Sequence, residues 1–303
     1  MRVDAVLIAG PTAGGKSEAA LALAERIGGA LINTDSMQVY REACILTARP
    51  GDTALARAPH FLYGHVSVND VYSVARYQSD AMEAFVRVRA SGKLPLFVGG
   101  TGLYFHALTE GLAEVPKIPE AIRKTVRARR EAMGAEAFFR ELAARDPDSA
   151  ARLRPSDRQR VLRAAEVLEA SGKPLAAWQR SSGSAPLAGL RLARFVLSPP
   201  RAELHQRIEA RFERMIAEGA LEEARSLKGL DPALPPVKLL GLRQLWAALD
   251  GALTLDDAIA SAKTATRQYA KRQLTWFRHR MADWVWIEAT DTAGIVAQML
   301  QHI

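Results

Sequence analysis

Cysteine is almost missing from this sequence: Cys44 is the one cysteine in 303 residues. A single thiol cannot form an internal disulfide, and without a histidine cluster or a second thiol it cannot anchor a structural zinc site. Long apolar runs are missing too, since no stretch approaches the roughly 20 residues that span a bilayer, and the N-terminus lacks a signal-peptide pattern. We therefore expect a soluble, cytoplasmic protein.

Acidic residues are outnumbered. The chain has 41 Lys and Arg against 33 Asp and Glu, a net charge of +8, which favours a polyanionic partner. Residues 117–163 and 261–280 each carry a net charge of +6, and the remainder is net negative. Each basic segment is either a solvated helix face, which is the commoner outcome, or part of a nucleic-acid surface.

The N-terminal segment predicts a buried parallel strand. VDAVLIAG at 3–10 is a nearly continuous apolar run that ends in glycine, and the helical pattern that follows it stops at Gly28-Gly29. Further strands are predicted at 30–33, 93–98, 193–198 and, weakly, 285–289. Strands that alternate with helices indicate an α/β fold with a parallel sheet flanked by helices, whose carboxyl-end loops share one crevice.

The middle of the chain has a different texture. From about Pro116 the sequence reads as helices rich in Arg, Ala and Glu, and no strand candidate interrupts them before residue 193. We predict an all-helical insertion domain at 117–192 within a core made of 1–116 and 193–303.

A phosphate-binding loop follows the first predicted strand. It comprises Gly10, Pro11, Thr12, Ala13, Gly14, Gly15, Lys16 and Ser17. Its glycines let backbone N–H groups surround phosphate oxygens, Lys16 neutralises charge, and the Ser17 hydroxyl can bind Mg²⁺. The loop does not identify its ligand, because a nucleoside triphosphate and any other diphosphate present similar oxygens.

The acid that usually helps phosphate-hydrolysing enzymes is missing. The third predicted strand ends in Val98-Gly99-Gly100-Thr101, which argues against a plain NTPase. The available carboxylate is Asp35, after the second strand. It is either a turn or cap residue or, as its position favours, a base that accepts a proton from a nucleophile.

Two other polar features have open interpretations. Thr101 either contacts a ligand from its glycine-rich loop or caps the next helix. Arg207 and Arg211 are one helical turn apart and face one side of a helix. They either clamp a diphosphate, which we favour, or pair with neighbouring glutamates.

The order and spacing of GPTAGGKS, TDSMQVY, GGTGLY, DRQRVLRAAEV, KLLGLRQLW and ATRQYAKRQLTWFR resemble the bacterial tRNA dimethylallyltransferases over essentially the whole chain. The resemblance implies a P-loop kinase-like core with a helical insertion domain, and Mg²⁺ as cofactor. The implied activity is transfer of a dimethylallyl group from dimethylallyl diphosphate to N6 of adenosine 37 in tRNAs reading UNN codons.

The resemblance also implies roles for single residues. Asp35 matches the family's base, and Thr101 matches the threonine that binds the bridging oxygen of the diphosphate. The segment Asp35, Ser36, Met37 and Gln38 would hold the flipped-out adenine. Contacts with the tRNA anticodon stem-loop are implied for Arg123, Gln159, Arg160, Val161, Leu162, Arg163, Arg243 and Gln244. Tyr269, Trp276 and Phe277 either stack on RNA or are buried.

Some positions depart from the family pattern. Where the family has a segment resembling GMDIGTAKP, this chain has EACILTARP, with Cys44 at the Asp and Leu46 at a Gly position. Leu242 stands where Tyr is common. A leucine cannot copy a glycine that needs positive φ, so a changed local backbone is expected.

The main alternative function is a P-loop small-molecule or nucleotide kinase, in which Asp35 would activate a substrate hydroxyl. A non-enzymatic RNA-binding protein is a more distant one. We expect the chain to act as a monomer.

Overall fold

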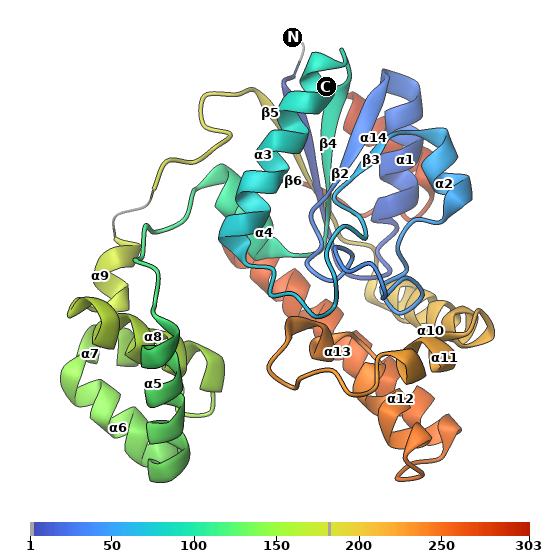
Figure 1. Cartoon of the computed structure of the whole chain (residues 1–303). Helices are drawn as coiled ribbons and strands as arrows, with labels where there is room; N and C mark the ends of the chain where they lie inside the picture. The colour runs from blue at the N-terminus through green and yellow to red at the C-terminus, as the bar shows by residue number, and fades with distance from the viewer. Residues whose placement is uncertain (1–2, 181–182) are drawn as a thin grey trace. The chain divides into compact units, whose positions relative to one another are not determined.

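The structure is a computed structural model that describes residues 3–180 and 183–303, so Ser181 and Ser182 of the predicted loop 181–189 lie outside the described residues. The chain divides into two compact units (Figure 1). The first unit contains the chain up to Leu108 and Gly189–Ile303, and the second contains Thr109–Ala188. The predicted boundaries of the insertion were 117 and 192.

The first unit contains a parallel sheet. Within the described residues it has six strands in the order β3-β2-β4-β1-β5-β6, which confirms the predicted α/β fold. The strands are β1 (Ala5–Ala9), β2 (Gly29–Asn33), β3 (His60–Phe61), β4 (Leu94–Gly99), β5 (Leu192–Leu197) and β6 (Val285–Ile287). The sequence did not predict β3, because two residues are too few to show a period.

Helices cover both faces of this sheet (Figure 1). On one face lie α1 (Lys16–Ile27) and α14 (Thr292–Leu300), whose apolar residues pack on Val6, Ile8 and neighbouring strands. The other face carries α3 (Val74–Ala90) and α4 (Gly102–Thr109), which the stacked rings of Tyr77 and Tyr104 join. The short α2 (Asp52–Arg57) precedes β3. Burial on both faces explains why β1 reads as one continuous apolar run.

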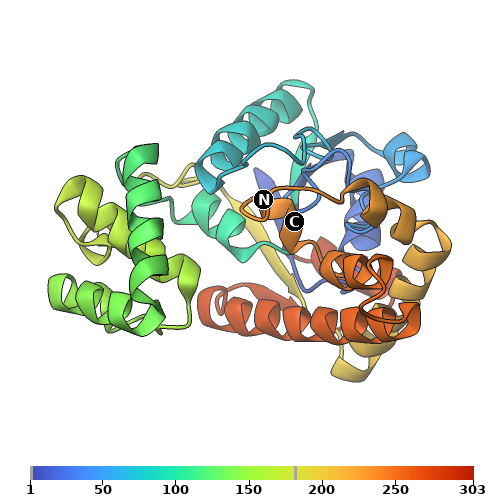
Figure 2. The same ribbon diagram turned by 60° about the horizontal axis from the view of Figure 1, so that its bottom comes forward.

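Further helices of the first unit gather beyond the carboxyl ends of the strands (Figures 1 and 2). They are α10 (Arg201–Ala217), α11 (Ala220–Ser226), the 3₁₀ turn η1 (Pro235–Lys238), α12 (Leu242–Leu249) and α13 (Leu255–Arg280). On α13, Phe277 is fully buried, and the ring of Trp276 packs so closely on Gly102 that a Cβ there would overlap it. Packing therefore accounts for these two aromatic side chains.

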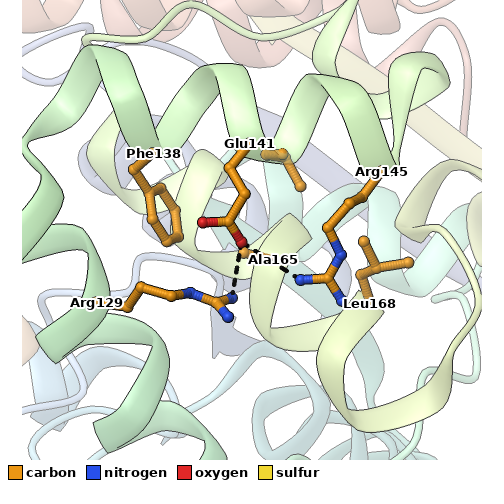
Figure 3. Close-up of a pocket in the computed structure, with 7 residues that line it drawn as sticks. Arg129, Phe138, Glu141, Arg145, Ala165 and Leu168 are labelled. Atoms are coloured by element: carbon orange, nitrogen blue, oxygen red, sulfur yellow. Dashed lines mark hydrogen bonds and ion pairs between the residues drawn. The ribbon is translucent and has the colours of Figure 1, made fainter.

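The second unit is helical where it is described. It contains α5 (Glu120–Met133), α6 (Ala135–Arg145), α7 (Pro147–Ala150), α8 (Arg158–Ser171) and α9 (Leu175–Gln179). Its core includes Val126, Phe138, Leu142 and Val161. A small cavity of about 10 Å³ between α5, α6 and α8 (Figure 3) has room for about one water molecule, so it is a packing gap and not a ligand site.

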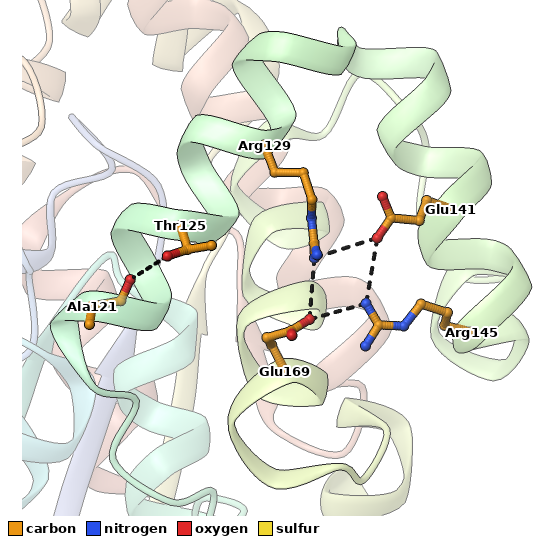
Figure 4. A network of polar contacts seen from close by, with 6 residues as sticks. All are labelled: Ala121, Thr125, Arg129, Glu141, Arg145 and Glu169. Carbon is orange, nitrogen blue, oxygen red and sulfur yellow. Dashed lines mark hydrogen bonds and ion pairs between the residues drawn. The ribbon is translucent and has the colours of Figure 1, made fainter.

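Four charged side chains join three helices of the second unit (Figure 4). Arg129 and Arg145 each lie within 3.5 Å of both Glu141 and Glu169. The hydrogen bond from Arg145 lowers the pKa of the Glu169 carboxyl, and Arg129 adds to this shift. Part of the basic excess at 117–163 is thus used internally, to hold α5, α6 and α8 together.

In the part of the chain that the structure describes, no helix has both the length and the apolar character needed to cross a bilayer.

Candidate functional site

The phosphate-binding loop joins the end of β1 to the start of α1. Gly15 precedes the first residue of α1 with a φ of 85°, a left-handed conformation that favours glycine. The Gly14 N–H donates to the Pro11 carbonyl at 3.1 Å, and the Lys16 ammonium donates to the same carbonyl at 2.6 Å. The loop therefore places its backbone N–H groups and Lys16 at the positive end of a helix, where an anion is stabilised.

A cleft of about 480 Å³ opens beside this loop. Its walls come from the phosphate loop, the ends of β2 and β4, α10 and the start of α14. The lining residues include Thr12, Ala13, Gly14, Gly15, Lys16, Ser17, Asp35, Gln38, Thr47, Tyr63, Arg207, Arg211 and Arg214. The cleft brings together the phosphate loop and the Asp35 segment, two of the three loops that the sequence placed in one crevice, while the third loop, 99–104, contributes Gly99. The cleft is large enough for a small phosphorylated molecule.

Arg207 and Arg211 both line the cleft, as their spacing on α10 predicted. Arg211 donates to the Thr12 hydroxyl at 3.2 Å and to the Thr47 carbonyl at 3.3 Å. Arg207 donates to Glu203 at 2.9 Å and to the Thr290 carbonyl at 2.5 Å. Arg207 therefore pairs with a glutamate, as one interpretation expected, and it also lines the cleft; the diphosphate clamp stays a prediction.

Asp35 follows β2 in a loop that the buried Asn33 holds. The Asn33 side chain accepts from the Asp35 N–H at 2.9 Å and donates to the Asp35 and Leu62 carbonyls at 2.9 and 3.0 Å. One carboxylate oxygen of Asp35 accepts from the Met37 N–H at 2.9 Å. Asp35 thus makes the expected turn contact while its carboxylate also lines the cleft. Sequence reasoning overlooked Asn33, which is the last residue of the predicted second strand.

Thr101 joins the loop after β4 to the loop after β2. Its hydroxyl accepts from the Ser36 N–H at 2.9 Å and donates to the Ser36 hydroxyl at 3.2 Å. This approach depends on Gly99, where a Cβ would overlap the Thr34 carbonyl group. The Thr101 side chain therefore contacts the Asp35 segment, while its carbonyl accepts from the Tyr104 and Phe105 N–H groups at 2.9 and 3.4 Å in the first turn of α4.

Gln273 on α13 bridges the phosphate loop and the β4 loop. Its side chain is buried, its oxygen accepts from the Thr12 N–H at 2.9 Å, and its nitrogen donates to the Gly100 carbonyl at 2.7 Å. The sequence pattern RQYAKRQLTWFR contains this glutamine but indicates no role for it. Its place inside that segment, on the buried side of a long basic helix, was the available signal.

Gln38 contacts the segment EACILTARP, in which the sequence differs from the pattern of the family that it resembles. Its amide nitrogen donates to the Thr47 and Ala48 carbonyls, both at 3.0 Å. Leu46 is buried, and its φ is not positive; Ala48 has the positive φ of 47° instead. The leucine at position 46 is therefore compatible with the observed backbone.

The predicted RNA contacts of the second unit lie on two helices. Arg160 is exposed on α8, with an ion pair to Asp157 at 3.4 Å, and Gln159 beside it is exposed. Arg163 on α8 and Arg123 on α5 are half-buried, and burial lowers the pKa of Arg163. The Val161 side chain is fully buried in the core of this unit, and Leu162 packs against it, so these two side chains face the protein.

The remaining predicted RNA contacts belong to α12. Arg243 is exposed and Gln244 is half-buried. Leu242, which precedes them, is fully buried and so presents no surface to a ligand.

Burial is the main cause that lowers the pKa of Lys16; the negative charge of Asp35 opposes it and the positive charge of Arg211 adds to it, so that the pKa is about 8. Since the pKa is depressed, the ammonium form is complete only well below pH 8 and is lost as the pH rises through this value.

The sequence matches two known families. The family described as IPP transferase matches residues 38–280, and the one described as isopentenyl transferase matches residues 3–68. The tRNA dimethylallyltransferase of Methylobacterium radiotolerans is 52% identical over 290 residues, which cover 95% of this chain and 94% of that protein. The same enzyme of Rhizobium meliloti is 47% identical over 295 residues, covering 96% of this chain and 97% of that protein.

Solved structures are similar over most of the chain. The full-length tRNA isopentenylpyrophosphate transferase of Bacillus halodurans has a TM-score of 0.71 and 32% identity, covering 99% of this chain and 95% of that one. A eukaryotic dimethylallyltransferase acting on tRNA has a TM-score of 0.80 and 27% identity, covering 96% of this chain and 75% of that one.

The depressed pKa of Lys16 predicts a titration near pH 8, where an ordinary lysine titrates above 10. Inorganic diphosphate bound at the loop should raise this pKa by roughly one unit or more, because negative charge favours the ammonium form. NMR of ¹³C-labelled lysine would follow the titration, and Lys16→Arg would assign the resonance by removing it. A midpoint near 10 without diphosphate would contradict the prediction.

Proposed function

Since this chain belongs to the IPP transferase family, we propose that it transfers a dimethylallyl group from dimethylallyl diphosphate to N6 of adenosine 37 in tRNAs that read UNN codons. The observation that supports this best is the single cleft that joins an anion-binding loop to the Asp35 carboxylate. A diphosphate bound at the loop would lie beside a group able to accept a proton, which group transfer to a weak amine nucleophile needs.

The proposed reaction is a displacement. The N6–C1 bond forms while the bond between C1 and the bridging diphosphate oxygen breaks, and the electrons of that bond leave with diphosphate. The proton of N6 passes to the Asp35 carboxylate. Thr101, whose hydroxyl accepts from the Ser36 N–H, is proposed to turn its proton from the Ser36 hydroxyl to the bridging oxygen. The loop would thus stabilise a leaving group and not an attacked phosphate.

The diphosphate is proposed to bind the backbone N–H groups of the phosphate loop together with Lys16, Arg207 and Arg211. Among the described residues no group of three or more His, Cys, Asp or Glu side chains could hold a metal ion. Mg²⁺ often takes one or two protein ligands and completes its shell with phosphate oxygens and water. Ser17, exposed at the start of α1, would be its protein ligand, and the ion would neutralise charge on the departing diphosphate.

The nucleophile is proposed to reach Asp35 as a flipped-out adenine, because N6 cannot contact a carboxylate while the base is stacked. Ser36, Met37 and Gln38 would hold this base. The anticodon stem-loop is proposed to bind Arg243 and Gln244 of the first unit and, on the second unit, Arg123, Arg163 and residues 159–162. We place the reaction in the cytoplasm because the relatives' names give tRNA as substrate. We also propose that the protein acts as a monomer.

A P-loop kinase is not favoured. The relatives that match nearly the whole chain are prenyltransferases, and β4 ends in glycine, followed by Gly100 and Thr101, with no acid to help position a nucleoside triphosphate and its metal.

The proposed function predicts incorporation of the prenyl group into tRNA. Unmodified tRNA reading UNN codons, incubated with the protein, Mg²⁺ and labelled dimethylallyl diphosphate, should gain label at adenosine 37 and release diphosphate. A tRNA with guanosine at position 37 is the matched control. A parallel reaction with ATP should consume none of it; ATP consumption without prenylation would support the kinase alternative.

Asp35→Asn should lower kcat by roughly 10²- to 10⁴-fold, the range typical for a lost general base. The variant keeps the oxygen that accepts from the Met37 N–H, so the turn and the affinity for tRNA should persist. Asp52→Asn, at the exposed start of α2, is the control and should behave as the unaltered protein. A collapse of tRNA affinity in Asp35→Asn would mean that Asp35 mainly holds the base.

Replacing Arg160 and Arg163 together by Gln should weaken tRNA binding and flatten its salt dependence, because fewer counterions are released. Filter binding between about 50 and 200 mM salt would measure the slope of log K against log salt concentration, which the two substitutions should reduce by roughly 1 to 2. The matched control replaces Arg89 and Arg191, which both pair with Asp4 before β1. An unchanged slope would make Arg160 and Arg163 a solvated helix face.

A further inference from the structure

One carboxylate holds three consecutive backbone N–H groups at the edge of the candidate site. Glu223 of α11 accepts from the N–H groups of Cys44 and Ile45 at 2.9 and 2.8 Å through one oxygen, and from Leu46 at 2.8 Å through the other. Hydrogen bonds to an ionised acceptor are stronger than neutral ones, and successive N–H groups that converge form an anion-binding concavity. Glu223 therefore fixes this stretch of backbone to α11.

The segment 43–49, here named the bridge loop, is held together by hydrogen bonds within itself. The Thr47 hydroxyl donates to the Ala43 carbonyl at 2.6 Å, and the N–H groups of Ala48 and Arg49 donate back to the Ile45 and Cys44 carbonyls. The position of the 44–46 backbone consequently sets where the Thr47 and Ala48 carbonyls lie.

Those two carbonyls hold one residue from each half of the proposed site. The Thr47 carbonyl accepts from Arg211, which also binds Thr12 of the phosphate loop. The Thr47 and Ala48 carbonyls accept from the Gln38 amide, which lies in the segment proposed to bind adenine. Thr47 and Ala48 also line the cleft. The bridge loop thus stands between the diphosphate half and the nucleoside half.

We propose that Glu223 is a positioning residue that sets Arg211 and Gln38 through the bridge loop, so that the two substrate half-sites are coupled. This inference rests on the proposed function. Glu223 touches neither substrate in it; its carboxylate acts on backbone N–H groups, and the Thr47 carbonyl transmits the effect to both side chains.

Glu223→Gln tests the proposal, because the amide replaces one acceptor by a donor that faces an N–H group. Steady-state kinetics with both substrates should show about a tenfold or larger rise in KM for dimethylallyl diphosphate and for tRNA, with kcat changed less than about threefold, the pattern of lost ground-state binding. Glu222→Gln is the matched control, since Glu222 is exposed on the same helix and pairs with Arg225. It should leave both KM values unchanged.

A binding measurement separates the failure of this proposal from failure of the proposed function. Calorimetry with inorganic diphosphate should show weaker binding to Glu223→Gln than to Glu222→Gln whether or not either variant prenylates tRNA. Prenylation absent from the unaltered protein contradicts the proposed function, whereas equal diphosphate affinity in the two variants overturns the role of Glu223.

The route through Arg211 is tested by a double-mutant cycle. In an Arg211→Lys background, Glu223→Gln should change diphosphate affinity much less than it does alone, because residues that act through one contact are not additive. Additive effects would overturn the proposal. Should Glu223→Gln fold poorly by circular dichroism, Glu223→Asp, which keeps the charge, allows the same cycle with a smaller effect and the same criterion.

Discussion

The close approach of two backbones at the carboxyl edge of the sheet is the constraint on which the site depends. At the end of β4, Gly99 lies against the Thr34 carbonyl with no room for a side chain, and this contact brings Thr101 within hydrogen-bond distance of Ser36. Gln273 then joins Gly100 to Thr12. Two loops with different chemical tasks are held at a fixed separation by backbone contacts and one buried amide. Pre-organisation of this kind reduces the ordering cost at the moment of reaction.

The site differs from that of a phosphate-hydrolysing enzyme in the charged groups that surround its phosphate-binding loop. Positive groups from α1 and α10 face the cleft, while its carboxylates come from Asp35 at the end of β2 and from Glu18 of α1, and not from the end of β4. This arrangement suits departure of a diphosphate from carbon, where charge develops on the leaving oxygen and a proton must be removed from the incoming amine. The charge of Lys16, which burial makes sensitive to pH, links anion binding to proton uptake.

Local signals predicted much of this structure, and long-range contacts explain the rest. The buried strands appear as apolar runs, and the phosphate loop has a spacing that few other structures require, so β1, β2, β4 and the cleft followed from the sequence. Gln273 did not, because its partner Thr12 is 261 positions away and a glutamine on a basic helix has no local signature. Helical spacing also placed Arg207 on the cleft, but spacing alone could not predict that its side chain pairs with Glu203.

Glu223 contacts only main-chain N–H groups of the bridge loop, and every residue except proline supplies such a group. The side chains at positions 44 to 46 are therefore released from the task of holding the loop. Substitution at these positions should therefore cost little, and the cysteine and leucine present there leave the contact with Glu223 intact. Selection should act instead on Glu223. We therefore expect this glutamate to vary less among related sequences than the side chains at positions 44 to 46 that it holds in place.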